Sequence, residues 1–242
     1  MRTLKKLFIL SVVTFFNFVF STVFAQALGY ECTYQEKIDI AAQISERMGD
    51  GPEKDAVLAF MNKRKSFYTL TFADGKSLWE KDNNRSDDDF GMSAASPSIF
   101  VDFGKQEQTT LINFFGRSFI ITDTMHHGEW QFTNETKEIA GLNCTKATGG
   151  DSVVVTVWFS METPIPAGPQ TCYGLPGLVT EMSVGPVTYT LTEIKALDKN
   201  PKLKQPSKGK KVTQKEFEEL VKQKLEEMGF GGMGEGMQMF RF

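Results

Sequence analysis

The stretch SFYTLTFADGKSLWEK, residues 66–81, carries the clearest signal of the fold. From Tyr68 to Phe72, bulky apolar residues alternate with threonine, which predicts a strand with one buried face. Asp74 and Gly75 follow directly, and this pair tolerates the positive φ angles that a two-residue hairpin turn requires. The stretch therefore predicts a β-hairpin.

Further strand-like segments follow this hairpin at short, even spacing. They are TTLINFF at 109–115, SFIITDT at 118–124, DSVVVTVWFSM at 151–161 and VTYTLTEI at 187–194. Such spacing predicts a mainly β fold, with a single curved antiparallel sheet or half-barrel. One helix is predicted in the N-terminal half, beginning at Pro52, and one amphipathic helix near the C-terminus.

The first residues have the layout of a secretory signal peptide. Three basic residues precede an apolar stretch from Leu7 to Phe20, and small residues follow at Ala25 and Ala27. We expect a signal peptide over residues 1–25, with cleavage after Ala25 or Ala27. An uncleaved membrane anchor is the alternative, because the apolar stretch approaches the ~20 residues of a spanning helix. Export predicts a periplasmic, outer-membrane-associated or extracellular location, with no transmembrane span in the mature chain.

Charge and composition divide the rest of the chain. Removing the leader takes away three positive charges and no negative one, so the net charge goes from −3 to −6. A mildly acidic surface argues against a nucleic-acid partner.

Thr213 and Glu216 have capping-box spacing before an apolar stripe. The predicted divisions are a β domain at 26–197, a basic linker at 198–212, an amphipathic helix at 213–229 and a Gly/Met-rich flexible tail at 230–242. The linker is expected to be exposed.

The phrase GPQTCYGLPGLVTEM, residues 168–182, contains a turn signal at Gly174, Leu175, Pro176 and Gly177. Pro176 fixes the first corner of a type II turn, and Gly177 is expected to take positive φ at the second. Gly174 is expected to allow another backbone or a ligand to approach closely.

This phrase resembles the signature of the GLPGLI family of exported bacterial proteins. Four other stretches follow the order and spacing of that family: FYTLTFADGKSLWEK, EWQF, TKEIAGLNCTKAT and VVTVWFSMETPIPAGP. The resemblance therefore covers residues 28–195. The sequence departs from the pattern at Val179 and at Cys172. The resemblance implies export and β architecture but supplies no activity. The chain is also similar, more weakly, to the half-barrels of periplasmic lipoprotein carriers, which hold acyl chains or peptides in a concave apolar face.

We expect a non-catalytic cell-envelope protein, because no base, nucleophile and orienting group can be assembled from these motifs. It would bind an apolar small molecule, a lipid or a peptide, or else an outer-membrane protein. The residues expected on the apolar face of the sheet are Tyr68, Leu70, Phe72, Trp130, Trp158 and Tyr189. The same residues also have the pattern of a packed core.

Two other functions remain open from the sequence. The first is copper handling through the soft thioether ligands Met233, Met237 and Met239, with His126 or His127. The two histidines are neighbours, and neighbours on a strand point to opposite faces, so they cannot easily grip one ion together. The second is a hydrolase of unknown class.

The three cysteines, Cys32, Cys144 and Cys172, allow one disulfide at most. We do not expect a bridge between Cys144 and Cys172, because the strand that holds Trp158 should lie between them.

Overall fold

The computed structural model describes residues 27–39, 41, 44–45, 50–87, 96–126, 128–150 and 153–227. They form a single 12-stranded sheet and two helices, α3 (Pro52–Lys63) and α4 (Gln214–Glu227). The strands are β1 (Gly29–Ile38), β2 (Ser66–Ala73), β3 (Lys76–Lys81), β4 (Ser98–Asp102), β5 (Glu107–Phe114), β6 (Arg117–Thr124), β7 (Gln131–Ile139), β8 (Leu142–Gly149), β9 (Val155–Ser160), β10 (Leu178–Val184), β11 (Val187–Leu197) and β12 (Lys210–Lys211).

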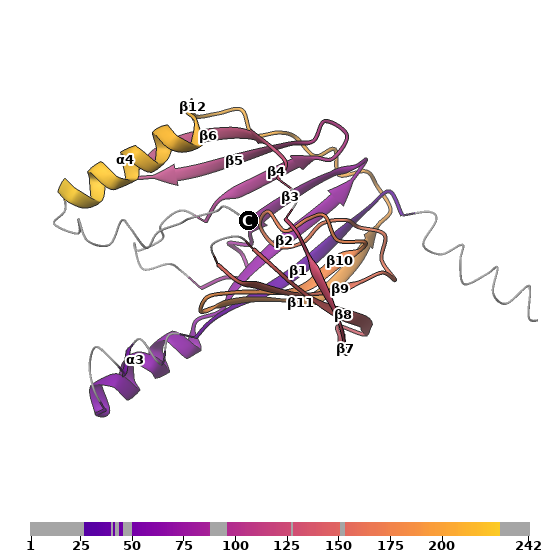
Figure 1. Ribbon diagram of the computed structural model, residues 1–242. Helices are drawn as coiled ribbons and strands as arrows, with labels where there is room; N and C mark the ends of the chain where they lie inside the picture. The colour runs from indigo at the N-terminus through magenta and orange to yellow at the C-terminus, as the bar shows by residue number, and fades with distance from the viewer. Residues whose placement is uncertain are drawn as a thin grey trace, which may run out of the picture.

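The sheet is open and strongly curled, which confirms the predicted fold class. Its order is β12-β6-β5-β4-β3-β2-β1-β11-β10-β9-β8-β7. Figure 1 shows β4 to β6 in an upper half, β7 to β11 in a lower half, and β1 to β3 joining them. Every neighbouring pair is antiparallel except β12 and β6, which are parallel. The sheet is therefore mixed, because the chain returns after β11 to reach the far edge.

Hairpin turns connect neighbouring strands, and the turn between β2 and β3 is the one that the sequence predicts. Asp74 and Gly75 have φ angles of 51° and 67° between β2 and β3. Ala140 and Gly141 have φ angles of 50° and 78° between β7 and β8. Positive φ at both central residues matches the right-handed twist of the flanking strands. These local turns set the register of each hairpin.

The main core lies on the inner face of the curled sheet. Cross-strand pairing places Leu70 beside Trp79, and Trp79 beside Ile99, in one row across β2, β3 and β4. Trp79 is only 1% exposed. The segment between β9 and β10, residues 161–177, lies between the two halves of the sheet (Figure 1) and contributes buried residues such as Ile165 to the same core.

Helix α3 extends away from the sheet in Figure 1. Its first turn contains Glu53 and Asp55 and its last turn contains Lys63, so its charges complement the helix dipole. Phe60 is 57% exposed. The sequence correctly predicts this helix, but its described residues add nothing to the buried core.

Helix α4 is docked on the sheet. Phe217 is buried against Ile112, Phe119 and Ile121 in a second apolar cluster, separate from the main core. Ile112 and Phe119 pair across β5 and β6 on the face that also holds Ile99 of β4. The helix therefore covers the inner face at one edge of the sheet and does not extend over its centre.

We predict that Phe217→Ala releases α4 from the sheet. Burial of a phenylalanine contributes about 1.5–3 kcal/mol, and a helix of this length is marginal in isolation. Hydrogen exchange at residues 214–227 should become much faster, with little change at Trp79 in the main core. Phe60→Ala in the exposed helix is the control and should change neither region. Unchanged protection of α4 in the Phe217 variant would contradict the docking.

Candidate functional site

A cluster of four aromatic rings occupies the middle of the inner face. Trp79 stacks on Tyr68 with ring centroids 5.0 Å apart and an interplanar angle of 5°. Tyr34 and Tyr189 meet Trp79 edge-on at 5.4 Å and 5.5 Å. Aromatic pairs prefer such stacked and edge-to-face geometries. The rings come from β1, β2, β3 and β11, so the cluster connects the centre of the sheet.

The polar ends of the aromatic side chains bind the segment 161–177 and the start of β10. Tyr34 Oη donates a 2.6 Å hydrogen bond to the carbonyl oxygen of Val179. Gln170 Nε2 donates to Tyr189 Oη at 2.8 Å. Trp130 Nε1 donates to the carbonyl oxygen of Tyr173 at 3.3 Å. These bonds attach the segment to β11 and to the residues before β7, and they attach the start of β10 to β1.

Tyr173 makes the corresponding contact with the opposite half of the sheet. Its hydroxyl donates to Gln108 Oε1 of β5 at 2.9 Å and accepts from the backbone nitrogen of His126 at 3.2 Å. Tyr173 itself is buried. The segment 161–177 therefore bridges both halves of the curled sheet from within, and we call it the plug.

Glu36 is a half-buried carboxylate beside this cluster. Tyr68 Oη lies 3.5 Å from Glu36 Oε1 and 3.2 Å from Ser96 Oγ. Burial raises the pKa of Tyr189, and the charge of Glu36 raises it further. The Tyr189 hydroxyl is therefore a neutral hydrogen-bonding group at physiological pH.

The six residues predicted to form an apolar ligand face do not share one accessible surface. Tyr68, Leu70 and Tyr189 are buried in the main core. Phe72 packs edge-on against Phe103, at a centroid distance of 6.0 Å. These side chains contact other side chains of the protein on the inner face. The alternation of apolar residues in the sequence therefore marks a packed core.

Trp130 and Trp158, the other two predicted residues, lie apart from each other. Trp130 is half-buried and bonded to the plug. Trp158 belongs to the outer face, where Lys137 Nζ lies 4.3 Å and Lys146 Nζ 6.0 Å from its ring centroid. Lys137 also pairs with Glu181 at 2.8 Å. Trp158 is thus covered by a network of charges.

The predicted type II turn is wrong in one respect. Gly174 adopts positive φ, at 87°, whereas Gly177 does not. A Cβ built on Gly177 would lie 2.1 Å from the carbonyl oxygen of Ser160. The two glycines therefore have the reverse of the predicted roles, because the end of β9 packs directly against the backbone at Gly177. Leu175 is buried in the core and Pro176 is exposed.

The residues proposed for copper are not brought together by the described part of the chain. His126 is exposed, with Nε2 3.7 Å from Asp123 Oδ2. Met233, Met237, Met239 and His127 lie outside the described residues. Within the described residues, no three His, Cys, Asp or Glu side chains are grouped so that they could hold a metal ion.

All three cysteines are buried free thiols. This confirms the prediction that Cys144 and Cys172 are not bridged. Burial raises the pKa of Cys172 to about 12, and burial with the nearby charge of Glu31 raises that of Cys32 to about 12. The thiolate form needed for reaction is therefore suppressed.

We predict that these thiols make stability fall in alkaline solution. Their usual pKa is 9.0, so the unfolded chain loses these protons first as the pH rises. Stability present below pH 9.0 should then be lost by about 1.4 kcal/mol per pH unit for each thiol, up to pH 12. Denaturant unfolding at several pH values measures this loss. Cys172→Ala should show a shallower slope than the parent, and an equal slope would contradict the assignment.

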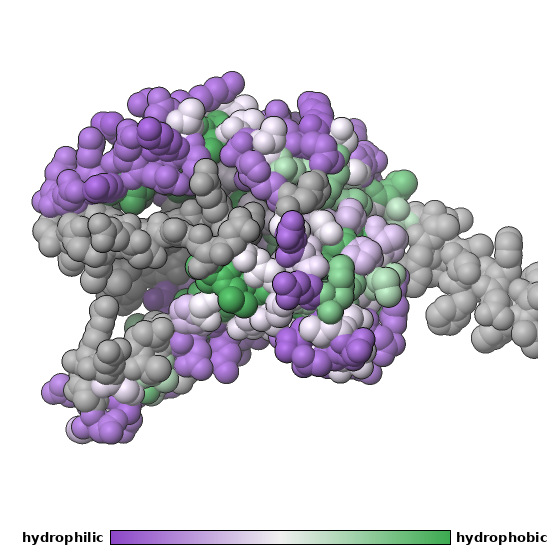
Figure 2. All heavy atoms as spheres, viewed as in Figure 1, coloured by the Kyte–Doolittle hydropathy of each residue, from purple (hydrophilic) through white to green (hydrophobic). Residues whose placement is uncertain are grey.

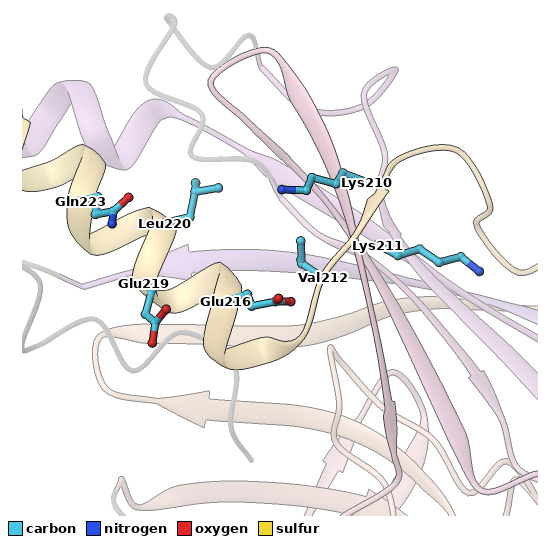
Figure 3. A pocket seen from close by; sticks show the side chains of 7 residues that line it. All are labelled: Lys210, Lys211, Val212, Glu216, Glu219, Leu220 and Gln223. Carbon is cyan, nitrogen blue, oxygen red and sulfur yellow. The ribbon is translucent and has the colours of Figure 1, made fainter.

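A shallow hollow lies between α4 and β12, on the edge of the sheet. It has a volume of about 280 Å³ and is lined by Lys210, Lys211, Val212, Glu216, Glu219, Leu220 and Gln223 (Figure 3). Both acidic and basic side chains surround it. We assign no ligand to it.

The fold places the chain among curled β-sheet proteins. Solved structures of PNGF-II share it: one in space group P21 has a TM-score of 0.55 at 17% identity and aligns with 81% of this chain and 33% of its own. Another in space group C2 has a TM-score of 0.53 at 16% identity, with coverages of 80% and 32%. The chain thus spans about a third of the length of that protein. At this identity the likeness concerns the fold alone.

A family profile described as a protein of unknown function (Porph_ging) matches residues 150–181. The matched region contains strand β9, the plug and the first part of β10. It fits the resemblance to an exported bacterial family, although the profile does not carry the GLPGLI name. No curated protein sequence matches the chain. Within the described residues, no helix is long and apolar enough to cross a membrane.

Proposed function

We propose that this protein is a non-catalytic component of the cell envelope that binds a partner at the outer membrane through its outer surface. The observation that carries this proposal is the plug, which occupies the inner face of the curled sheet. Of the residues predicted to meet an apolar ligand, Tyr189 and Trp130 instead bind the plug, and Tyr68 packs against Tyr189 in the main core. This favours a surface interaction over storage of an apolar molecule inside the sheet.

The energetics of the plug support that choice. An apolar ligand on the inner face would have to displace Ile165, Tyr173, Leu175 and their neighbours, all of them buried. Re-exposing several such side chains costs on the order of 10 kcal/mol, comparable to the whole stability of a domain. Breaking the tyrosine hydrogen bonds adds about 1 kcal/mol for each. A ligand would need very high affinity to offset this cost.

Cell fractionation with native mass spectrometry tests the proposal. The full chain is produced with its leader in a Gram-negative host, and a chain lacking residues 1–25 serves as the control. We expect the exported protein in the outer-membrane fraction, released by salt, with a mass equal to that of the polypeptide alone. The control should remain in the cytoplasm.

Each other outcome identifies a different function. A bound lipid or peptide mass would show that the inner face opens for a ligand. A copper adduct would support metal handling. Recovery of the exported chain in the soluble fraction at low salt would contradict a partner at the outer membrane.

A further inference from the structure

The segment that joins β11 to α4 is strongly basic. Residues 198–212, which we call the strap, contain one acidic residue, Asp198, and six lysines. All six are exposed: Lys199, Lys202, Lys204, Lys208, Lys210 and Lys211. Within the described residues, none of them forms a salt bridge with a carboxylate. The charges of five of them are therefore available to a partner, whereas Lys210 faces α4, where its charge helps to lower the pKa of Glu216.

The strap is fixed to the sheet along its length. Asn200 hydrogen-bonds to Asp74 in the β2–β3 turn. Gln205 Nε2 donates to Thr109 Oγ1 of β5 at 2.8 Å and to Glu107 Oε1 at 3.1 Å. Strand β12 then pairs with β6, and the Thr213–Glu216 capping box begins α4. The backbone positions of the lysines are thus set before any partner binds.

The strap covers the outer face of the sheet. Thr109, which Gln205 contacts, pairs with Phe100 on the face opposite the row of Trp79 and Ile99. In β12, Lys210 points back toward α4 and Lys211 points away from it (Figure 3). The chain therefore wraps around one edge of the sheet, with the lysine-rich strap outside and α4 inside.

Charge is distributed unevenly over the protein. With the leader removed the chain carries −6 and the strap carries +5, so the remainder carries −11. A negatively charged surface would repel the remainder and attract the strap, which fixes one orientation. Figure 2 shows hydrophilic residues along the upper rim, over α4 and the strap.

We propose that the strap is a docking surface for an anionic lipid bilayer. This rests on the proposed partner at the outer membrane and names the lipid surface as that partner. Clusters of four to eight basic residues bind anionic lipid, each contributing about fivefold to the affinity. Because the strap is already ordered by the sheet, binding avoids the entropy cost of ordering a free basic segment.

Vesicle binding tests the proposal with the mature full-length chain. The probe is a vesicle of equal parts phosphatidylglycerol and phosphatidylcholine, compared with phosphatidylcholine alone. We expect binding to the anionic vesicle only, with loss of binding in 1 M salt, where the screening length falls to about 3 Å. The triple variant Lys202→Gln, Lys204→Gln, Lys211→Gln should bind at least about tenfold more weakly.

A matched variant separates the strap from total charge. Lys37→Gln, Lys63→Gln, Lys195→Gln removes the same charge elsewhere and should bind like the parent, and all three proteins should have the same unfolding midpoint. Equal losses in both variants would overturn the assignment to the strap. Binding to soluble polyglutamate without binding to vesicles would replace the lipid with an acidic polymer. If the parent fractionates with the outer membrane but the strap variant does so equally well, the strap inference fails and the proposed function stands.

Discussion

Gly177→Ala should destabilise the fold by about 3 kcal/mol or more, because the added Cβ has no space. That atom would lie 2.1 Å from the carbonyl oxygen and 2.8 Å from the carbonyl carbon of Ser160. Both are backbone atoms at the end of a central strand, so they cannot move without distorting β9. Urea unfolding of the parent and the variant measures the loss.

Gly174→Ala is the matched control within the same phrase. Gly174 is exposed and has a φ of 87°, so alanine there introduces backbone strain, which costs about 1 kcal/mol. A larger effect at Gly174 than at Gly177 would contradict the close approach of Gly177 to Ser160.

Gly75 and Gly177 show why one part of the fold can be predicted from the sequence and another cannot. The Asp74-Gly75 turn is predictable because the chemistry that requires it lies within the turn itself. The requirement at Gly177 comes from Ser160, which belongs to the strand before the plug. No local pattern reports which backbone will pack against a glycine. The pattern correctly predicts that glycine is needed here but assigns the wrong reason.

Trp79 is a core residue that the sequence analysis does not predict, although the sequence contains a signal for its position. In β3, Leu78 and Trp79 are adjacent apolar residues, so alternation alone does not decide which one faces the core. The two-residue turn at Asp74-Gly75 does decide it, because that turn fixes the register and places Trp79 opposite Leu70. Register counted outward from the turn would have added Trp79 to the predicted core.

The strap was predicted as exposed, and its contacts were not foreseen. Its lysines are exposed, but Gln205 and the backbone of β12 hold it against β5 and β6. A segment held by backbone pairing and one amide side chain has no apolar periodicity to detect. The α4 helix, in contrast, has an apolar stripe, and the sequence correctly predicts it. The stripe does not show on which edge of the sheet the helix docks.

Trp79→Ala should be among the most destabilising single substitutions in the chain, at about 3–5 kcal/mol, because it leaves a cavity in the centre of the core. Trp79 contacts the rings of Tyr34, Tyr68 and Tyr189, and its removal also loosens the support of Tyr189, which accepts a hydrogen bond from Gln170 of the plug. Guanidinium unfolding followed by circular dichroism measures the loss without relying on tryptophan fluorescence.

Trp158→Ala removes the same side chain from the outer face and should cost no more than about 1–2 kcal/mol, since it loses partial burial and the contacts with Lys137 and Lys146. The ratio of the two losses distinguishes a packed interior from an open apolar face. If the inner face held an empty ligand site, Trp79 would have few neighbours to lose and the two substitutions would cost similar amounts. Similar losses would therefore contradict both the filled interior and the surface-binding function that rests on it.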